Sequence, residues 1–152
     1  MARHQSLIPL SHDHHHGLAL ALRCRKQALG RIKPLGSQGL KERAEEFRKF
    51  FAQNLTPHFK AEEEALFPLM RSTMPDSHPL IDDLLRDHER LRAAAADLSG
   101  GKELAKILFD VGDLLERHIR REERELFPLF EKHVDASNGE RLKAEIEGIL
   151  AR

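Results

Sequence analysis

Two eleven-residue segments of this chain carry histidine and glutamate at the same spacing. Residues 58–68 read HFKAEEEALFP and residues 118–128 read HIRREERELFP, so the pair His58 and Glu62 returns as His118 and Glu122. A spacing of four residues places the two side chains of each pair about one turn, roughly 6 Å, apart on the same face of a helix. Two such helices facing each other would bring two imidazoles and two carboxylates to one metal centre, where each carboxylate can bridge two ions.

The elements that must position these residues are helical. Leu, Ala, Glu, Lys and Arg dominate and no strand-like alternation appears, which predicts an all-α chain. We expect helices over about 11–31, with Ser11 as N-cap, and over about 40–71, 80–98 and 102–133, separated by Gly- and Pro-rich stretches. A short tail helix is expected over about 137–150. Pro68 and Pro128 fall inside expected helices and predict a kink near each.

This arrangement predicts an up-down-up-down four-helix bundle with a short C-terminal tail helix. At 152 residues the chain is expected to form one domain over 1–152, with the bundle core at about 10–134.

Ligand-type residues interrupt the apolar stripe of three expected helices. The stripe of the last long helix runs through Leu104, Leu108, Val111, Leu115, His118, Glu122, Leu126 and Leu129. The second helix carries His58 and Glu62 in the same way, and the third carries His88. A carboxylate in an apolar core costs several kcal/mol, by a rough estimate, unless it is paired or binds a metal, and no Lys or Arg falls on these stripes at that height. One HxxxE pair alone is usually a surface contact, but its repetition favours metal ligation.

The first helix contains the cluster HDHHH at 12–16. Its stripe is read as Ile8, Ser11, His15, Leu18 and Leu22, all in steps of three or four. This pattern favours His15 as the inward ligand, with His14 as the second choice because it points about 100° away. His12 and His16 are expected at the surface, and Asp13 is expected to cap the helix or to accept a hydrogen bond from a ligand.

Composition excludes several classes of partner. The 25 basic residues balance the 25 acidic ones, so we expect neither nucleic acid nor an anionic membrane as partner. No long apolar run suggests a signal peptide or a membrane span. The single cysteine, Cys24, cannot form an intramolecular disulfide, which favours the cytoplasm, and we expect it to be a packing residue.

The doubled HxxxE…LFP, the DH at 87–88 and the opening SHDHHHGL together resemble the hemerythrin-like family, the HHE cation-binding domains. The resemblance covers about residues 10–134. It implies a four-helix bundle around a non-haem di-iron centre, bridged by carboxylates and by an oxo or hydroxo group. The implied metal ligands are His58, Glu62, His88, His118, Glu122 and one or both of His14 and His15.

Two positions depart from the respiratory members of that family. Those proteins have a second histidine one turn after the ligand of the third helix, where this chain has Arg92. They also use an aspartate five residues after the histidine of the fourth helix, where this chain has Glu122 at four residues. The resemblance is therefore to the broader HHE branch, as a stand-alone module, and not to the dedicated oxygen carriers.

Three functions follow from these ligands. The first is a protein that holds two iron ions and reversibly binds or senses O₂ or NO, or handles iron. The second is a di-iron enzyme acting on peroxide or NO, which the absence of Tyr and Trp as electron relays disfavours. The third is a structural bundle with zinc or no metal, since imidazole and carboxylate ligands also suit manganese and zinc. No residue pattern identifies a protein partner.

Overall fold

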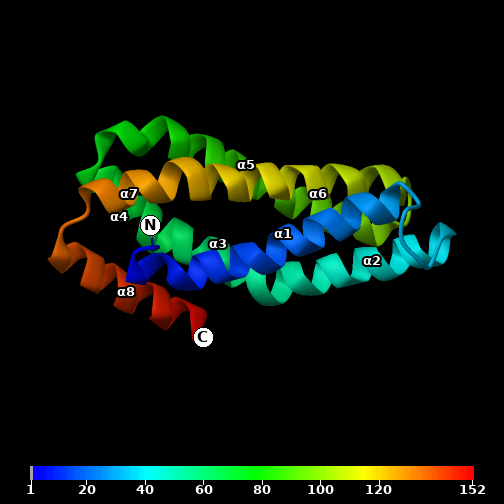
Figure 1. Cartoon of the computed structure of the whole chain (residues 1–152), viewed down its shortest axis with the longest axis horizontal. Coiled ribbons are helices and arrows are strands. Elements are labelled where there is room, and N and C mark those ends of the chain that lie inside the picture. Colours follow the sequence, from blue (N-terminus) through cyan, green and yellow to red (C-terminus); the bar gives the residue numbers. More distant parts are fainter. Residues whose placement is uncertain (1) are drawn as a thin grey trace.

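The computed structural model describes residues 2–152, and over this range the chain is helical and contains no β-strand. Successive long helical segments run in opposite directions along one axis (Figure 1). This architecture confirms the predicted all-α bundle with a C-terminal helix. The long segments are α1 (Ile8–Ala28), the run from α2 (Gly36–Phe50) to α4 (Phe67–Thr73), α5 (His78–Asp97), and the run from α6 (Leu104–Arg121) to α7 (Phe127–His133).

The second and fourth long segments are not uniform α-helices. Within the second lie two π-helical turns, η2 (Phe51–Leu55) and η3 (Glu62–Leu66), on either side of α3 (Thr56–Ala61). The fourth contains one such turn, η6 (Glu122–Leu126). Short 3₁₀ turns precede α1, as η1 (Gln5–Leu7), and lie in two of the connections, as η4 (Pro75–Ser77) and η5 (Leu98–Gly100).

Each π turn stands directly before a proline near the start of the next α-helical segment: Pro57, Pro68 and Pro128. Proline has no N–H to donate, and its ring clashes with the carbonyl four residues earlier. A π turn bonds each N–H five residues back, as the N–H of Phe67 does to the carbonyl of Glu62. The distortion expected near Pro68 and Pro128 is therefore a widened turn, and its first residue is Glu62 or Glu122.

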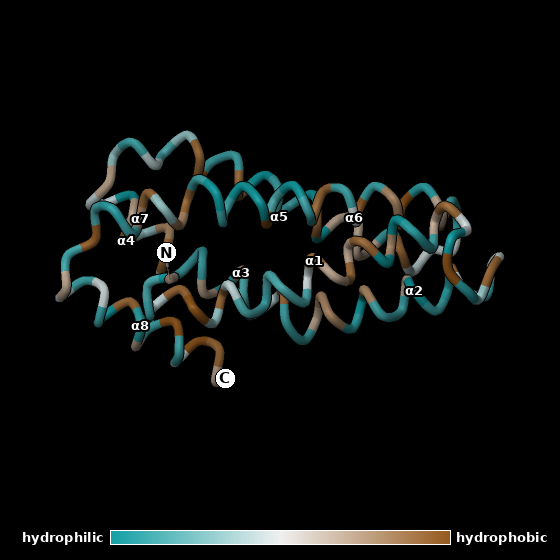
Figure 2. Tube along the Cα trace, in the orientation of Figure 1, coloured by the Kyte–Doolittle hydropathy of each residue, from teal (hydrophilic) through white to brown (hydrophobic). Residues whose placement is uncertain are grey.

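The buried side chains form two hydrophobic clusters along the bundle. One gathers residues such as Leu66, Phe67, Phe127 and Phe130, and the other gathers residues such as Phe47, Phe59, Leu91, Leu108 and Leu115. In Figure 2 hydrophobic and hydrophilic stretches alternate along the helices, as expected where one face of each helix is buried. The polar layer described below contacts aromatic residues of both clusters.

The tail helix α8 (Ala136–Leu150) completes one of these clusters. Asp135 caps it by accepting a hydrogen bond from the backbone N–H of Asn138 at 2.7 Å. Its buried residues Leu142, Ile146 and Ile149 belong to the same cluster as Leu7. The helix lies beside the N-terminal end of the chain (Figure 1), and it packs on η1, α3 and η3.

Helix α1 packs closely on α6, and glycines make this approach possible. A Cβ atom on Gly112 would lie 2.7 Å from the carbonyl oxygen of Ala21, and one on Gly17 would lie 2.8 Å from the Cδ1 atom of Ile119. The buried face of α1 accordingly contains small residues: Gly17, Ala21 and Cys24.

The face of α1 predicted from its large apolar residues is wrong. Ile8 and Leu22 are exposed, at 52% and 43%, because the close contact with α6 admits smaller side chains. The predicted N-cap is also wrong, since α1 begins at Ile8 with Pro9 in its first turn, where the missing N–H of proline is harmless. Ser11 lies inside the helix, and its hydroxyl donates a hydrogen bond to Glu123.

Within residues 2–152, no helix has both the length and the apolar character needed to cross a membrane.

Candidate metal centre

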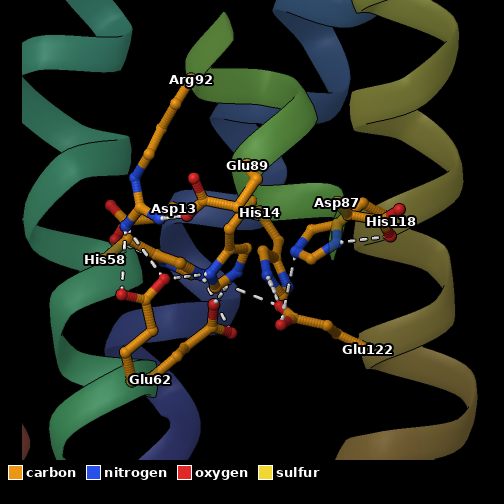
Figure 3. Close-up of polar contacts among 11 residues, drawn as sticks. Asp13, His14, His58, Glu62, Asp87, Glu89, Arg92, His118 and Glu122 are labelled. Carbon is orange, nitrogen blue, oxygen red and sulfur yellow. Dashed lines mark hydrogen bonds and ion pairs between the residues drawn. The ribbon is translucent and has the colours of Figure 1, made fainter. Parts of the chain in front are cut away.

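Six buried histidine and glutamate side chains from the four long helical segments meet inside the bundle. Each has at most 2% of its surface exposed. Figure 3 draws the site, in which the labelled side chains of His14, Glu62, His118 and Glu122 converge from several helices onto one small volume. The six are His14 on α1, His58 on α3, Glu62 at the start of η3, His88 on α5, His118 on α6 and Glu122 at the start of η6.

The six side chains form two overlapping groups that share both carboxylates. The first group contains His14 and His58, the second contains His88 and His118, and Glu62 and Glu122 belong to both. Within each group, one nitrogen or oxygen atom from every residue lies within 4.8 Å of the others. Two groups with common carboxylates are the arrangement expected of a binuclear metal site.

Each carboxylate directs one oxygen to each histidine pair. The Oε1 atom of Glu62 lies 3.1 Å from Nε2 of His88, and its Oε2 atom lies 3.4 Å from Nε2 of His58. Glu122 does the same: Oε1 lies 2.8 Å from Nε2 of His14, and Oε2 lies 3.5 Å from Nε2 of His118. Both carboxylates are therefore placed to bridge two ions.

Four further carboxylates orient the four histidines. In each case the Nδ1–H of the imidazole donates to a carboxylate oxygen, so the Nε2 lone pair is left to face the centre. The contacts are His14 to Glu123 at 2.6 Å, His58 to Asp13 at 3.1 Å, His88 to Glu63 at 2.6 Å, and His118 to Asp87 at 3.0 Å.

These supporting contacts repeat with a two-fold pattern. Asp13, which precedes His14 in the chain, accepts a hydrogen bond from His58. In the same way Asp87, which precedes His88, accepts one from His118. In return Glu63 and Glu123, which follow Glu62 and Glu122 in the chain, accept hydrogen bonds from His88 and His14. The role predicted for Asp13 as an acceptor is confirmed. Sequence reasoning missed Glu63, Asp87 and Glu123, although each stands directly beside a candidate ligand in the chain.

Arginine side chains hold two of the supporting glutamates. Arg92 donates to both carboxylate oxygens of Glu63, at 2.9 and 3.1 Å. Arg3 donates to Glu123 at 3.2 Å, and Ser11 donates to the same carboxylate at 2.6 Å. Arg92, which departs from the respiratory hemerythrin pattern, therefore acts on His88 through Glu63.

The electrostatics of the centre favour positive charge. Burial lowers the pKa of His118, but the carboxylates of Glu122 and Asp87 outweigh burial and raise that pKa to about 10. Burial likewise opposes protonation of His58, yet Glu62 and Asp13 hold its pKa well above the usual value. Burial raises the pKa of Glu122, and His118 with its other partners brings it well below its usual range. A bound cation would replace these protons.

Unpartnered polar atoms support the same conclusion. Across the described chain, five buried side-chain atoms lack a hydrogen bond, and all belong to the six side chains: Oε1 and Oε2 of Glu62, Nε2 of His88, Nε2 of His118 and Oε2 of Glu122. A buried polar atom without a partner costs about 1–3 kcal/mol. Metal ions coordinated by these nitrogen and oxygen atoms would satisfy all five, so the residues present fit a binuclear cation site.

Six of the seven predicted ligands come together here, and His15 does not. His15 is exposed on the outer side of α1, while His14 is buried against the stacked ring of Phe127. The expectation that His15 points inward is wrong, because the inward face of α1 is set by its contact with α6. His12 and His16 are exposed, as predicted. That the six residues bind metal stays a prediction from their geometry.

Comparison with known proteins adds an independent finding. The chain matches the family model described as the Hemerythrin HHE cation binding domain over residues 6–130, and a second, overlapping match covers residues 80–151. Comparison with curated proteins and with solved structures gave no match. The family match includes all six converging side chains, and it covers most of the chain. The protein therefore belongs to the Hemerythrin HHE cation binding domain family.

Proposed function

We propose that this protein holds two iron ions without haem and reversibly binds or senses O₂ or NO. The observation that carries the proposal is the division of Glu62 and Glu122 between the two histidine pairs. Each ion would receive two imidazole nitrogens and two carboxylate oxygens. Non-haem iron commonly takes more than four ligands, so this donor set would leave coordination positions open for a small molecule.

The enclosure of the site supports a diatomic ligand. All six side chains are almost fully buried, and aromatic rings pack against the histidines. Phe59 stacks on His88 with 3.8 Å between the ring centroids, and Phe127 stacks on His14 at 5.4 Å. This burial and these rings shield the centre from bulk water, and a diatomic molecule would need only small fluctuations of the packing to enter.

The composition of the chain favours binding over oxidative turnover. A reduced iron pair would supply the electrons that bind O₂ or NO. The residues of this chain would hold the histidines in one tautomer, bridge the two ions and keep water out. The chain has neither Tyr nor Trp to relay electrons between the centre and the surface. The residues around the centre would therefore position the ions and exclude water, which suits reversible binding.

The test is metal analysis followed by optical spectroscopy of the full chain. The expected result is two iron ions per chain and absorption bands that appear when the reduced protein meets O₂ or NO and disappear when the gas is removed. Steady consumption of peroxide or NO would support the enzyme alternative instead. A protein without visible absorption that keeps its fold after treatment with a chelator would support the zinc-bound or metal-free bundle.

The Glu62→Ala variant, compared with Glu64→Ala as its matched control, sharpens this experiment. It should lose the iron-dependent spectrum, because both ions would lose a shared ligand. The Glu64→Ala variant changes a neighbouring glutamate whose side chain is 53% exposed, and it should keep the spectrum. Equal spectra in the two variants would contradict the assignment of the centre.

A further inference from the structure

The outer side of α1 carries a second pair of histidines that the buried centre does not use. His12 and His16 are both exposed and lie one helical turn apart. Their Nε2 atoms are 3.3 Å from each other, while their ring centroids are 4.9 Å apart with an angle of 80° between the planes. The two Nε2 atoms therefore face each other on the exposed side of the helix.

This separation matches two ligands of one transition-metal ion. With metal–nitrogen distances of about 2.0–2.1 Å, two nitrogens 3.3 Å apart subtend an angle of about 104–111° at the ion, close to the tetrahedral value. Between neutral rings the same contact is a single hydrogen bond, in which one Nε2–H donates to the other nitrogen. After rotation of the two side chains about their own bonds, a cation would accept both lone pairs at this separation with the helix unchanged.

The surroundings of the pair leave room for water ligands. A surface pocket of about 380 Å³ includes His12, Asp13 and Asn54. A second pocket of about 310 Å³ includes His16, and Asn54 lines it as well. Arg23 borders this second pocket, but its guanidinium lies 2.7 Å from the carboxylate of Glu46, which offsets its repulsion of a cation.

We propose that His12 and His16 form a surface site for one late first-row divalent cation, such as Zn²⁺, Ni²⁺ or Cu²⁺, with water in the remaining positions. Imidazole nitrogen is a preferred ligand of these ions. The site is separate from the buried centre, and it does not depend on which metal the buried centre holds. Binding would clamp the turn of α1 that carries Asp13 and His14, because one ion would tie position 12 to position 16.

The test is a titration of the untagged full chain, as isolated with its buried centre filled, with Ni²⁺ in a calorimeter. One ion per chain is expected to bind at the pair. His12→Ala and His16→Ala should each weaken this binding at least about tenfold, because a single imidazole loses the chelate advantage. The matched control is His15→Ala, which removes an exposed imidazole from the same helix and should leave the affinity unchanged.

Three outcomes would overturn the proposal: equal loss in His15→Ala and His12→Ala, unchanged affinity in both His12→Ala and His16→Ala, or sedimentation that shows Ni²⁺ linking two chains instead of binding within one. A measurement on the unaltered chain keeps the proposal testable if a variant fails to fold. Paramagnetic Cu²⁺ should broaden the ring proton signals of His12 and His16 before those of His15. The metal content and the optical spectrum of the buried centre are measured on the same samples. They test the proposed function of that centre independently of Ni²⁺ binding at the surface pair.

Discussion

Glu123 and His14 are joined across the bundle by a contact of 2.6 Å between Oε2 and Nδ1. The same carboxylate accepts hydrogen bonds from Ser11 and Arg3, so three groups fix its orientation. Glu123 follows Glu122 in η6, whereas His14 lies on α1. One side chain outside the six candidate ligands therefore holds the imidazole of α1 toward the metal centre.

This relationship predicts that Glu123→Gln weakens metal binding while the fold is kept. The amide removes the negative charge that would make the imidazole of His14 a stronger ligand, and loss of such a supporting group typically lowers metal affinity by about 10–100-fold. Competition with a chelator of known affinity measures the effect. Glu125→Gln alters an exposed glutamate two residues further on and should change little. Equal affinities in the two variants would remove the supporting role of Glu123.

Glu62→Ala is expected to release metal from the buried centre without unfolding the chain. The carboxylate of Glu62 belongs to both groups of candidate ligands, so its removal weakens both positions. The fold should survive because the variant also removes a buried charge, which can offset the lost coordination. Elemental analysis and circular dichroism give the two readouts. A variant that retains two ions per chain would exclude bridging by Glu62.

The stability of the metal-free chain and the extra stability given by metal should respond to pH in opposite directions. In the metal-free chain the carboxylates around His118 raise its pKa from 6.5 to about 10. A pKa raised by folding adds stability that is complete below the unfolded value and is lost as the pH rises to the folded value. The Tm of the metal-free chain should therefore fall from pH 6.5 towards pH 10 on account of this group.

Metal binding has the opposite dependence because it needs unprotonated imidazoles. The increase in Tm produced by metal should grow over the same range of pH. Thermal unfolding of chelator-treated and metal-loaded samples at several pH values provides the comparison. A stabilisation by metal that shrinks as the pH rises would argue against coordination through these histidines.

Gly112→Ala should destabilise the bundle by about 1–3 kcal/mol, the range expected for overpacking. The new Cβ would lie 2.7 Å from the carbonyl oxygen of Ala21, a backbone atom that can move only if α1 and α6 separate. Chemical denaturation measures the change in the free energy of unfolding. Gly148→Ala is the matched control, because this glycine of α8 has open space around its missing Cβ. There alanine should stabilise the helix by roughly 0.5–1 kcal/mol. Similar effects at both positions would refute the close contact.

Cys24 should be unreactive in the folded chain. Its side chain is fully buried, and burial raises the pKa of its thiol to about 12, so almost no thiolate is present near neutral pH. A colorimetric thiol reagent at pH 8 should react slowly with the native protein, and with one thiol per chain after denaturation. Rapid reaction before denaturation would show that α1 opens readily from α6.

The sequence alone predicted the helical bundle and most of the candidate centre. His58 with Glu62 and His118 with Glu122 were found because a spacing of four residues places two side chains on one helical face, whatever the helix packs against. His88 was found in the same way, since it interrupts an apolar stripe of large residues that the structure buries. Both signals depend only on the spacing of residues along one helix, so they do not change with the position of that helix in the fold.

Only the tertiary structure decided which histidine of the cluster at 12–16 turns inward. Large apolar residues suggested the face that contains His15. The close approach of α1 and α6 at Gly17 and at Gly112 instead buries the face of α1 that carries His14, Gly17, Ala21 and Cys24. Three of the four carboxylates that orient the histidines, Glu63, Asp87 and Glu123, were also beyond the sequence pattern. Each pairs with a residue at least 25 positions away, as Glu63 does with His88, and such a pair is set by how two helices pack together and not by periodicity within either one.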